Sequence, residues 1–221
     1  KSQMMLEQWA LVIHVLGWVF WLGTDLGVFL ACRYAERSDL SNETRFTLLE
    51  VGMVLDRLPR LAVPLVWGSG LILSAKWGYD FIPTTYGLTF TFIWLIATWG
   101  IIFQPPGSSL HRLCLRLQTL FYGLLIIGMG AGASWLLYSG GMPLWLAFKW
   151  YAYVVIAIAA IALDKYFAPV IIDFQLLATE GSSDSLNEKL SRDIKPVYTM
   201  VLVIYAGTLV AGLSGLLKPV L

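Results

Sequence analysis

The segment Leu11–Arg33, LVIHVLGWVFWLGTDLGVFLACR, decides the class of this protein. It is apolar over at least the roughly 20 residues that a helix needs to cross a bilayer. Two ionisable residues, His14 and Asp25, interrupt the apolar run. Ionisable side chains at membrane depth are costly, and they usually face the interior of a bundle or a site. The segment therefore predicts a transmembrane helix that forms one wall of an intramembrane site.

One face of this helix gathers the polar and aromatic side chains. They follow the spacing i, i+4, i+7 and i+11, which places them on one side of a helix: His14, Trp18, Trp21 and Asp25. Gly17 lies beside the histidine, and Gly23 and Gly27 form a small-xxx-small pair that lets another helix approach closely. We expect the rest of the chain to supply the opposite wall.

The composition places the chain among polytopic membrane proteins. Of the 221 residues, 58% are hydrophobic and only 13% are charged, which is unusual for a soluble domain. The formal net charge is +1 and there is no basic run, so nucleic acid is not expected as a partner, whereas membrane lipids are. The two cysteines, Cys32 and Cys114, make no disulfide framework.

Six apolar segments are long enough to be spans, at about residues 9–31, 61–75, 86–103, 113–138, 144–170 and 197–217. We therefore expect an all-α integral membrane protein, with six transmembrane helices in one bundle and a single domain over residues 1–221. Residues 40–58, starting with Ser41 as a cap, are expected to form a helix along the membrane or an extension of the second span. Residues 179–195 are expected to form a loop with a short helix. The charges of both segments are expected to be solvated.

The basic residues predict the orientation. Eleven fall in three loops on one side: Arg33, Arg37, Arg45, Arg57, Arg60, Arg112, Arg116, Lys165, Lys189, Arg192 and Lys195. Four fall on the other side: Lys1, Lys76, Lys149 and Lys218. The positive-inside rule therefore places both termini outside and the basic loops in the cytoplasm. The expected location is the cytoplasmic (inner) membrane.

His14 is the sharpest candidate for a site. Neutral imidazole is the commonest protein ligand of transition-metal ions, so one interpretation is a metal or haem ligand. The other is a histidine hydrogen-bonded to a neighbouring helix or to interfacial water. His111 is placed in a cytoplasmic loop, far from His14, so the two are not expected to bind one iron. It is interpreted as a plain surface histidine.

Lys149 is the expected counterpart of His14, because both lie about five residues inside spans that start on the outer side. A lysine facing inward pairs with the carboxylate of a ligand or caps a redox site, and Tyr153 lies one turn further along the same face. The alternative is a lysine that extends to the outer interface. Asp25, in the cytoplasmic half of the first span, is expected to pair with an arginine or a tyrosine hydroxyl, or to make a structural hydrogen bond.

Two pieces of the sequence resemble the HemJ-type protoporphyrinogen oxidase family: His14-x-x-Gly17-x-x-x-Trp21, and Trp145-Leu146-x-x-Lys149 at the start of a later span. More broadly, the chain is similar to membrane families grouped with the copper-resistance D proteins. The resemblance covers roughly the first 75 residues and residues 143–166. Proteins of the HemJ family have four spans rather than six, and often carry histidine where this chain has Ala147.

The resemblance implies b-type haem, because the matching histidine and lysine are essential in that family and its members bind haem. His14 would then be the iron ligand, Lys149 a second essential group and Trp21 a wall of the pocket. Trp18 and Trp21 are expected to stack on the flat macrocycle, with Gly17 leaving room for it.

Three functions remain open from the sequence. The first is a haem-b redox protein of the membrane, acting on a porphyrinogen or passing electrons to a quinone. The second is a non-catalytic membrane subunit of a larger complex. The third is a transporter of copper or another small solute. Self-association is compatible with the small-xxx-small faces.

Overall fold

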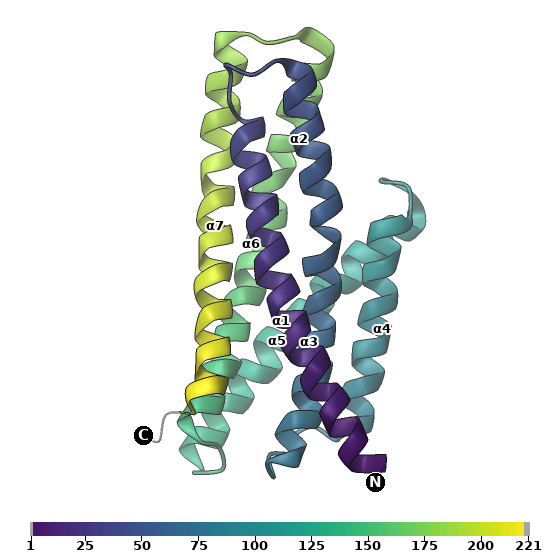
Figure 1. Ribbon diagram of the computed structural model, residues 1–221, viewed down its shortest axis with the longest axis vertical. Coiled ribbons are helices and arrows are strands. Elements are labelled where there is room, and N and C mark those ends of the chain that lie inside the picture. The colour runs from purple at the N-terminus through teal and green to yellow at the C-terminus, as the bar shows by residue number, and fades with distance from the viewer. Residues whose placement is uncertain (1, 219–221) are drawn as a thin grey trace. The chain divides into compact units, whose positions relative to one another are not determined.

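The computed structural model describes residues 2–218, and every regular element among them is an α-helix. The helices are α1 (Ser2–Ala35), α2 (Asn42–Leu55), α3 (Arg57–Lys76), α4 (Thr84–Phe103), α5 (Ser109–Tyr138), α6 (Leu144–Glu180) and α7 (Asp184–Leu217) (Figure 1). Among these described residues, six segments are long and apolar enough to cross a membrane, with α2 and α3 counted as one. The expected all-α fold with six spans is therefore confirmed.

The chain forms two compact units, and each is described by itself. The first contains Lys1–Asp25 and Asp56–Gly123, and the second contains Leu26–Leu55 and Leu124–Leu221. Helices α1 and α5 are therefore each divided between the two units. The single domain expected from the sequence stays a prediction.

In the first unit, the first half of α1 packs antiparallel to α3. Glu7 and Lys76 form an ion pair at 3.0 Å at one end of this contact. Further along, α3 contacts α4 through Gly68, where an added Cβ atom would lie 2.6 Å from the hydroxyl of Thr91. Glycine is required there because no side chain fits between the two helices.

Aromatic rings fill the space between α3, α4 and α5. Phe90 lies at the centre of this group, with its ring centroid 5.0 Å from that of Trp67 and 5.0 Å from that of Phe121. The rings of Trp94 and Tyr122 meet edge to face at 5.7 Å. Such edge-to-face pairs stabilise the packing beyond the apolar area that they bury.

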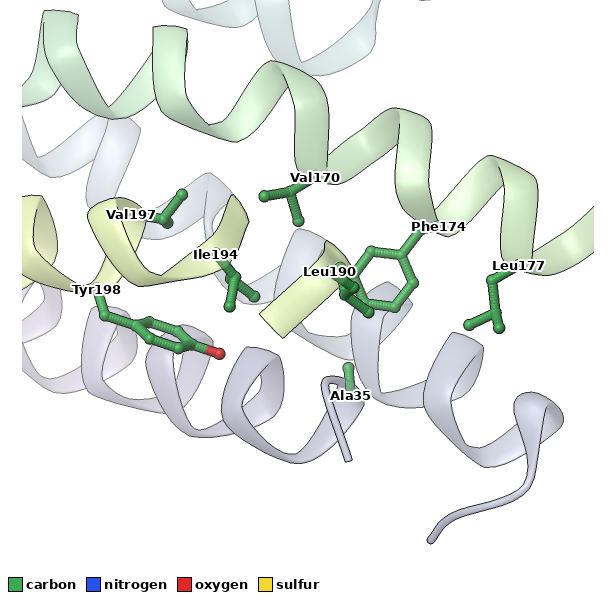
Figure 2. Packing of buried hydrophobic residues seen from close by; sticks show 8 residues of the cluster. All are labelled: Ala35, Val170, Phe174, Leu177, Leu190, Ile194, Val197 and Tyr198. Carbon is green, nitrogen blue, oxygen red and sulfur yellow. The ribbon is translucent and has the colours of Figure 1, made fainter. Parts of the chain in front are cut away.

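In the second unit, α6 and α7 form an antiparallel hairpin (Figure 1). Its polar end shares an apolar core with the end of α1 and with α2 (Figure 2), made by Ala35, Val170, Phe174, Leu177, Leu190, Ile194, Val197 and Tyr198. Phe46 and Leu49 of α2 pack against this cluster, and the rings of Phe46 and Phe174 lie 6.5 Å apart.

The expectation of a loop with a short helix over residues 179–195 was wrong. Only residues 181–183 separate α6 from α7, and Ser183 caps α7 by accepting a hydrogen bond from the backbone N–H of Leu186 at 3.3 Å. The physical reason is an apolar stripe: Leu186, Leu190 and Ile194 are spaced at four residues and face the core. This stripe stabilises a helix whose other face is polar.

Residues 40–58 form the extension of the second span rather than a separate surface helix. Only Asp56, itself in a right-handed helical conformation, separates α2 from α3. The Ser41 cap is confirmed, because its hydroxyl accepts from the backbone N–H of Thr44 at 3.3 Å. Met53, near the end of α2, is 49% exposed.

Arg45 contradicts the expectation that the charges of this segment are solvated, because it is fully buried. Its Nε atom donates to the carbonyl of Ala35 at 2.8 Å, and its Nη1 atom donates to Oδ1 of Asn187 at 3.0 Å. The last carbonyls of a helix lack intrahelical donors. Arg45 is buried because it donates hydrogen bonds to the end of α1 and links that end to α7.

Candidate functional site

The imidazole of His14, on α1, is held against one turn of α3. Its Nδ1 atom lies 2.9 Å from the carbonyl oxygen of Val66 and 3.2 Å from the hydroxyl oxygen of Ser69. The hydroxyl of Ser69 in turn donates to the carbonyl of Leu65 at 2.6 Å. The side chain is half-buried. Through Nδ1, His14 therefore forms the hydrogen bond to a neighbouring helix that the second interpretation predicts.

These partners determine which ring nitrogen carries the proton of the neutral imidazole. A carbonyl oxygen only accepts hydrogen bonds, so Nδ1 of His14 donates to Val66. Because the hydroxyl of Ser69 donates its hydrogen bond to the carbonyl of Leu65, the Ser69 oxygen is able to accept a hydrogen bond from the same Nδ1–H. The lone pair of the neutral ring therefore lies on Nε2. Metal-binding histidines are commonly oriented in this way, by a bond from the other ring nitrogen to a carbonyl.

Two glycines set the distance between α1 and α3 around this ring. A Cβ atom added to Gly70 would lie 3.2 Å from Cε1 of His14, so the imidazole rests on bare backbone. A Cβ atom added to Gly17 would lie 2.7 Å from Cγ2 of Val66. The space beside Gly17, which the sequence analysis assigned to a macrocycle, is thus taken by a side chain of α3.

The tryptophans on the His14 face differ in exposure. Trp21 is packed inside the first unit and is 5% exposed, whereas Trp18 is half-buried. Stacking of either ring on a macrocycle stays a prediction. Asp25 is half-buried, and its electrostatic neighbours are Asp56 and Arg60.

Lys149, on α6, lies against α7 in the second unit. A Cβ atom added to Gly215 would lie 2.8 Å from Nζ of Lys149, so the ammonium rests on α7 where a side chain is missing. One turn further along α7, the ammonium of Lys218 lies 5.9 Å from the centre of the Trp145 ring. Tyr153, one turn after Lys149, is buried. The end of the hairpin where α6 begins and α7 ends thus gathers two ammonium groups and aromatic rings.

His14 and Lys149 belong to different units, so the structure describes each with its own neighbours. Their shared cavity, expected from equal depth along spans that start on one side, stays a prediction. Each lies next to a glycine of another helix, Gly70 for the histidine and Gly215 for the lysine. In both cases a side chain at the glycine position would force the polar group to shift.

His111 lies in the first turn of α5 rather than in the loop where the sequence placed it. Its Nδ1 atom accepts from the backbone N–H of Gly107 at 3.4 Å, so it closes the turn before the helix. His14 contacts α3 at the level where α3 meets Thr91, whereas His111 follows the end of α4 at Phe103. Twelve residues of helix, about 18 Å, separate these two levels of α4.

A polar cluster that the sequence did not predict lies in the second unit, where α1 ends beside α7. Glu36 accepts from the hydroxyl of Ser191 at 2.9 Å and from that of Tyr198 at 2.8 Å. The guanidinium of Arg33 lies 5.0 Å from the centre of the Tyr198 ring. No spacing along the chain signals these contacts, because they join residues more than 150 positions apart. They fix the end of α1 to α7.

Residues able to form a multi-ligand metal cage are not clustered: the part of the chain with described side chains contains no group of three histidine, cysteine or acidic residues suited to a metal ion. Comparison with known proteins adds no family to this description. No family model, curated protein or solved structure matches the chain.

Proposed function

We propose that this multi-pass membrane protein binds b-type haem through His14 and acts in electron transfer or oxidation. The observation that carries the proposal is the hydrogen bond from Nδ1 of His14 to the carbonyl of Val66 at 2.9 Å. That bond orients the ring and leaves the lone pair of the neutral imidazole on Nε2, which is the nitrogen that binds haem iron in proximal histidines.

Haem fits the donor set better than a bare metal ion does. The porphyrin supplies four nitrogens, so the protein needs to supply only one or two axial ligands. A bare zinc or copper ion takes three or four protein ligands, and the residues whose side chains are described hold no group of that kind. The single imidazole of His14 is therefore sufficient for haem. When bound, the haem supplies one-electron chemistry, and its potential depends on the axial ligand and its hydrogen bonds.

The neighbouring residues receive positioning roles in this proposal. Gly17 and Gly70 set the separation of α1 and α3, and so fix where the imidazole points. Trp18 offers a half-buried aromatic face one turn from His14. Lys149 would neutralise a propionate of the haem, as the resemblance to the HemJ family implies, and Tyr153 lies one turn beyond it. Oxidation of a porphyrinogen and transfer of electrons to a quinone are the two reactions that we propose for the site.

The absorption spectrum of the purified protein tests the proposal. We expect a Soret band in the wild type, loss of that band in His14→Ala, and an unchanged band in the control His111→Ala. In Lys149→Ala we expect the band to persist or weaken while activity falls. A wild type without a Soret band after supply of haem would contradict the proposal. It would favour a non-catalytic membrane subunit, which copurification of partner subunits would identify.

The proposed location is the cytoplasmic membrane, with both termini outside. The support is the asymmetry of basic residues, eleven against four, because positively charged loops stay in the cytoplasm. A reporter fused after Leu221 should be active outside the cytoplasm, and one inserted at residues 181–183 should be active inside. The reverse pair of results would contradict the orientation, and with it the placement of His14 near the outer surface.

A further inference from the structure

Asp173 is a fully buried acidic residue on α6. Its two carboxylate oxygens differ in their hydrogen bonding. One oxygen, Oδ1, accepts a hydrogen bond from the ammonium of Lys189 on α7. The other, Oδ2, is buried and has no hydrogen-bond partner in the part of the chain that the structure describes. An unsatisfied buried carboxylate oxygen is costly. This oxygen therefore indicates a ligand that comes from outside the chain.

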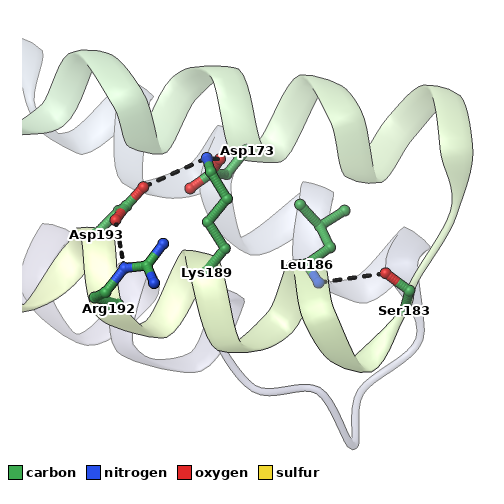
Figure 3. Close-up of polar contacts among 6 residues, drawn as sticks. All are labelled: Asp173, Ser183, Leu186, Lys189, Arg192 and Asp193. Atoms are coloured by element: carbon green, nitrogen blue, oxygen red, sulfur yellow. Dashed lines mark hydrogen bonds and ion pairs between the residues drawn. The ribbon is translucent and has the colours of Figure 1, made fainter.

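A second carboxylate faces the same ammonium. Nζ of Lys189 lies 3.4 Å from Oδ2 of Asp193, one turn further along α7. Figure 3 shows the Lys189 ammonium between the carboxylates of Asp173 and Asp193, which come from opposite helices of the hairpin. Arg192 lies 3.4 Å from the other oxygen of Asp193, on the outer side of the group. Two carboxylates from two helices thus converge on one position, and that position holds a positive charge.

The position is accessible from water. The side chain of Lys189 is 40% exposed and that of Asp193 is 20% exposed, although Asp173 is fully buried. All three residues lie outside the apolar segments 144–170 and 197–217. They lie at the polar end of the hairpin, beside the core that Val170, Phe174 and Ile194 share. Lys189 and Asp193 therefore form the exposed side of this group.

We propose that Asp173 and Asp193 form a binding site for a hydrated Mg²⁺ ion, and that the ammonium of Lys189 is its tethered competitor. Mg²⁺ is commonly held by one or two carboxylates and keeps several of its waters, whereas Ca²⁺ takes six to eight oxygen ligands. Two carboxylates neutralise a divalent ion. A hydrated ion at this position supplies a partner to Oδ2 of Asp173, which the ammonium does not reach.

The ammonium of Lys189 is suited to displacement by a divalent cation. Its ammonium is a compact charge on a flexible stem, and the side chain is 40% exposed. After displacement it returns to water at little cost, because it is partly exposed. The site is therefore an exchange site, in which the chain's own cation and a free divalent cation compete for the same two carboxylates. This inference does not depend on haem binding by His14.

Thermal unfolding of the purified full chain in MgCl₂, compared with KCl at equal ionic strength, tests the proposal. We expect a saturable rise of the melting temperature in MgCl₂ only, and loss of that rise in Asp193→Asn. In Lys189→Met we expect Mg²⁺ to act at a concentration lower by about tenfold or more, because a repelling charge a few ångströms away has been removed. The matched control is Glu188→Gln, an exposed acidic residue next to Lys189, which should respond as the wild type does.

Two results would overturn the proposal. The first is an equal change of the melting temperature in MgCl₂ and KCl, for both the wild type and Lys189→Met. It would show that only water forms hydrogen bonds to Oδ2 of Asp173. The second is an undiminished Mg²⁺ response in the double variant Lys189→Met with Asp193→Asn, which would place the ion elsewhere. The double variant keeps Asp173 in place, so the test does not depend on whether Asp173→Asn folds.

Discussion

His14 in the first unit and Arg45 in the second unit each form a hydrogen bond to the backbone of another helix. They differ in burial and in the side-chain nitrogens that form these hydrogen bonds. Arg45 is fully buried, and three of its nitrogens donate to Ala35, Glu36 and Asn187. His14 is half-buried, and its contacts to Val66 and Ser69 both involve Nδ1. The hydrogen bonds of Arg45 hold α2 against the end of α1 and against α7, whereas for His14 we propose ligand binding through Nε2 in addition to the contact with α3.

The largest expected effect comes from removing Arg45. Arg45→Ala leaves the carbonyls of Ala35 and Glu36 and the amide of Asn187 without their donors. Each unsatisfied buried group costs about 1–3 kcal/mol, so we expect the free energy of unfolding to fall by about 3 kcal/mol or more. Arg37→Ala is the control, because Arg37 is exposed and surface substitutions stay within about 0.5 kcal/mol. Denaturant unfolding followed by circular dichroism measures both, and equal losses would show that Arg45 has no structural role.

The next effect concerns the contact that holds the His14 ring in place. In Gly17→Ala the new Cβ atom would meet Val66 at 2.7 Å, and overpacking of this kind costs about 1–3 kcal/mol. Gly23→Ala is the matched control on the same helix, because nothing lies within 4 Å of its added Cβ atom. There we expect no loss, or a gain of up to about 1 kcal/mol from helix propensity. A stable Gly17→Ala protein would show that α1 and α3 are less tightly packed than described.

A smaller effect is expected at Gly70, and it separates ligand geometry from stability. The added Cβ atom of Gly70→Ala would lie 3.2 Å from Cε1 of His14, so the ring has to turn by a small amount. An off-rotamer side chain costs about 1 kcal/mol, which corresponds to a loss of haem affinity of about fivefold. Titration with haem measures this, with Gly128→Ala as control, since its Cβ atom meets nothing within 4 Å. Equal affinities in the two variants would contradict the role of Nδ1 in orienting the ligand.

The smallest effect on stability is expected from Arg37 and Asp39, an exposed pair in the connection between α1 and α2. Arg37 donates to Asp39 at 3.0 Å, and this hydrogen bond lowers the pKa of the Asp39 carboxyl below its ordinary value of 3.8. Because the pKa is lowered in the folded state, the contribution is complete above pH 3.8 and disappears as the pH falls through the lowered value. The stability difference between the wild type and Asp39→Asn should therefore be present at neutral pH and disappear as the pH falls through the lowered value, and acid titration of both proteins measures it. A difference that persists below that pH would contradict this origin.

The spans were predictable from the sequence because they depend on local composition. The run from Leu11 to Ala31 and the breaks at Pro105 and Pro106 are visible in the chain itself. Helix length was less predictable: α6 continues to Glu180 and α7 begins at Asp184. The residues that continue them are apolar only on one face, and that face is stabilised by the end of α1 and by α2.

The candidate site was predictable in its residue types but not in its contacts. His14 stands out because an ionisable residue in an apolar run is rare. Its partners Val66 and Ser69 do not stand out, because a backbone carbonyl carries no sequence signal and serines commonly bond to their own helix. Asp173 was missed for a related reason, since its burial depends on the packing of α6 against α7.

The length of α6 has a consequence for how the molecule responds to denaturants. Its 37 residues span about 55 Å at 1.5 Å per residue, whereas the hydrocarbon layer of a bilayer is about 30 Å thick. We therefore expect the remaining part of the hairpin, with the core around Phe174 and Leu190, to lie in water. Apolar side chains associate there by the hydrophobic effect, which does not act between helices in lipid. Urea should therefore loosen this end first, while the spans, held in detergent or lipid by packing, stay folded.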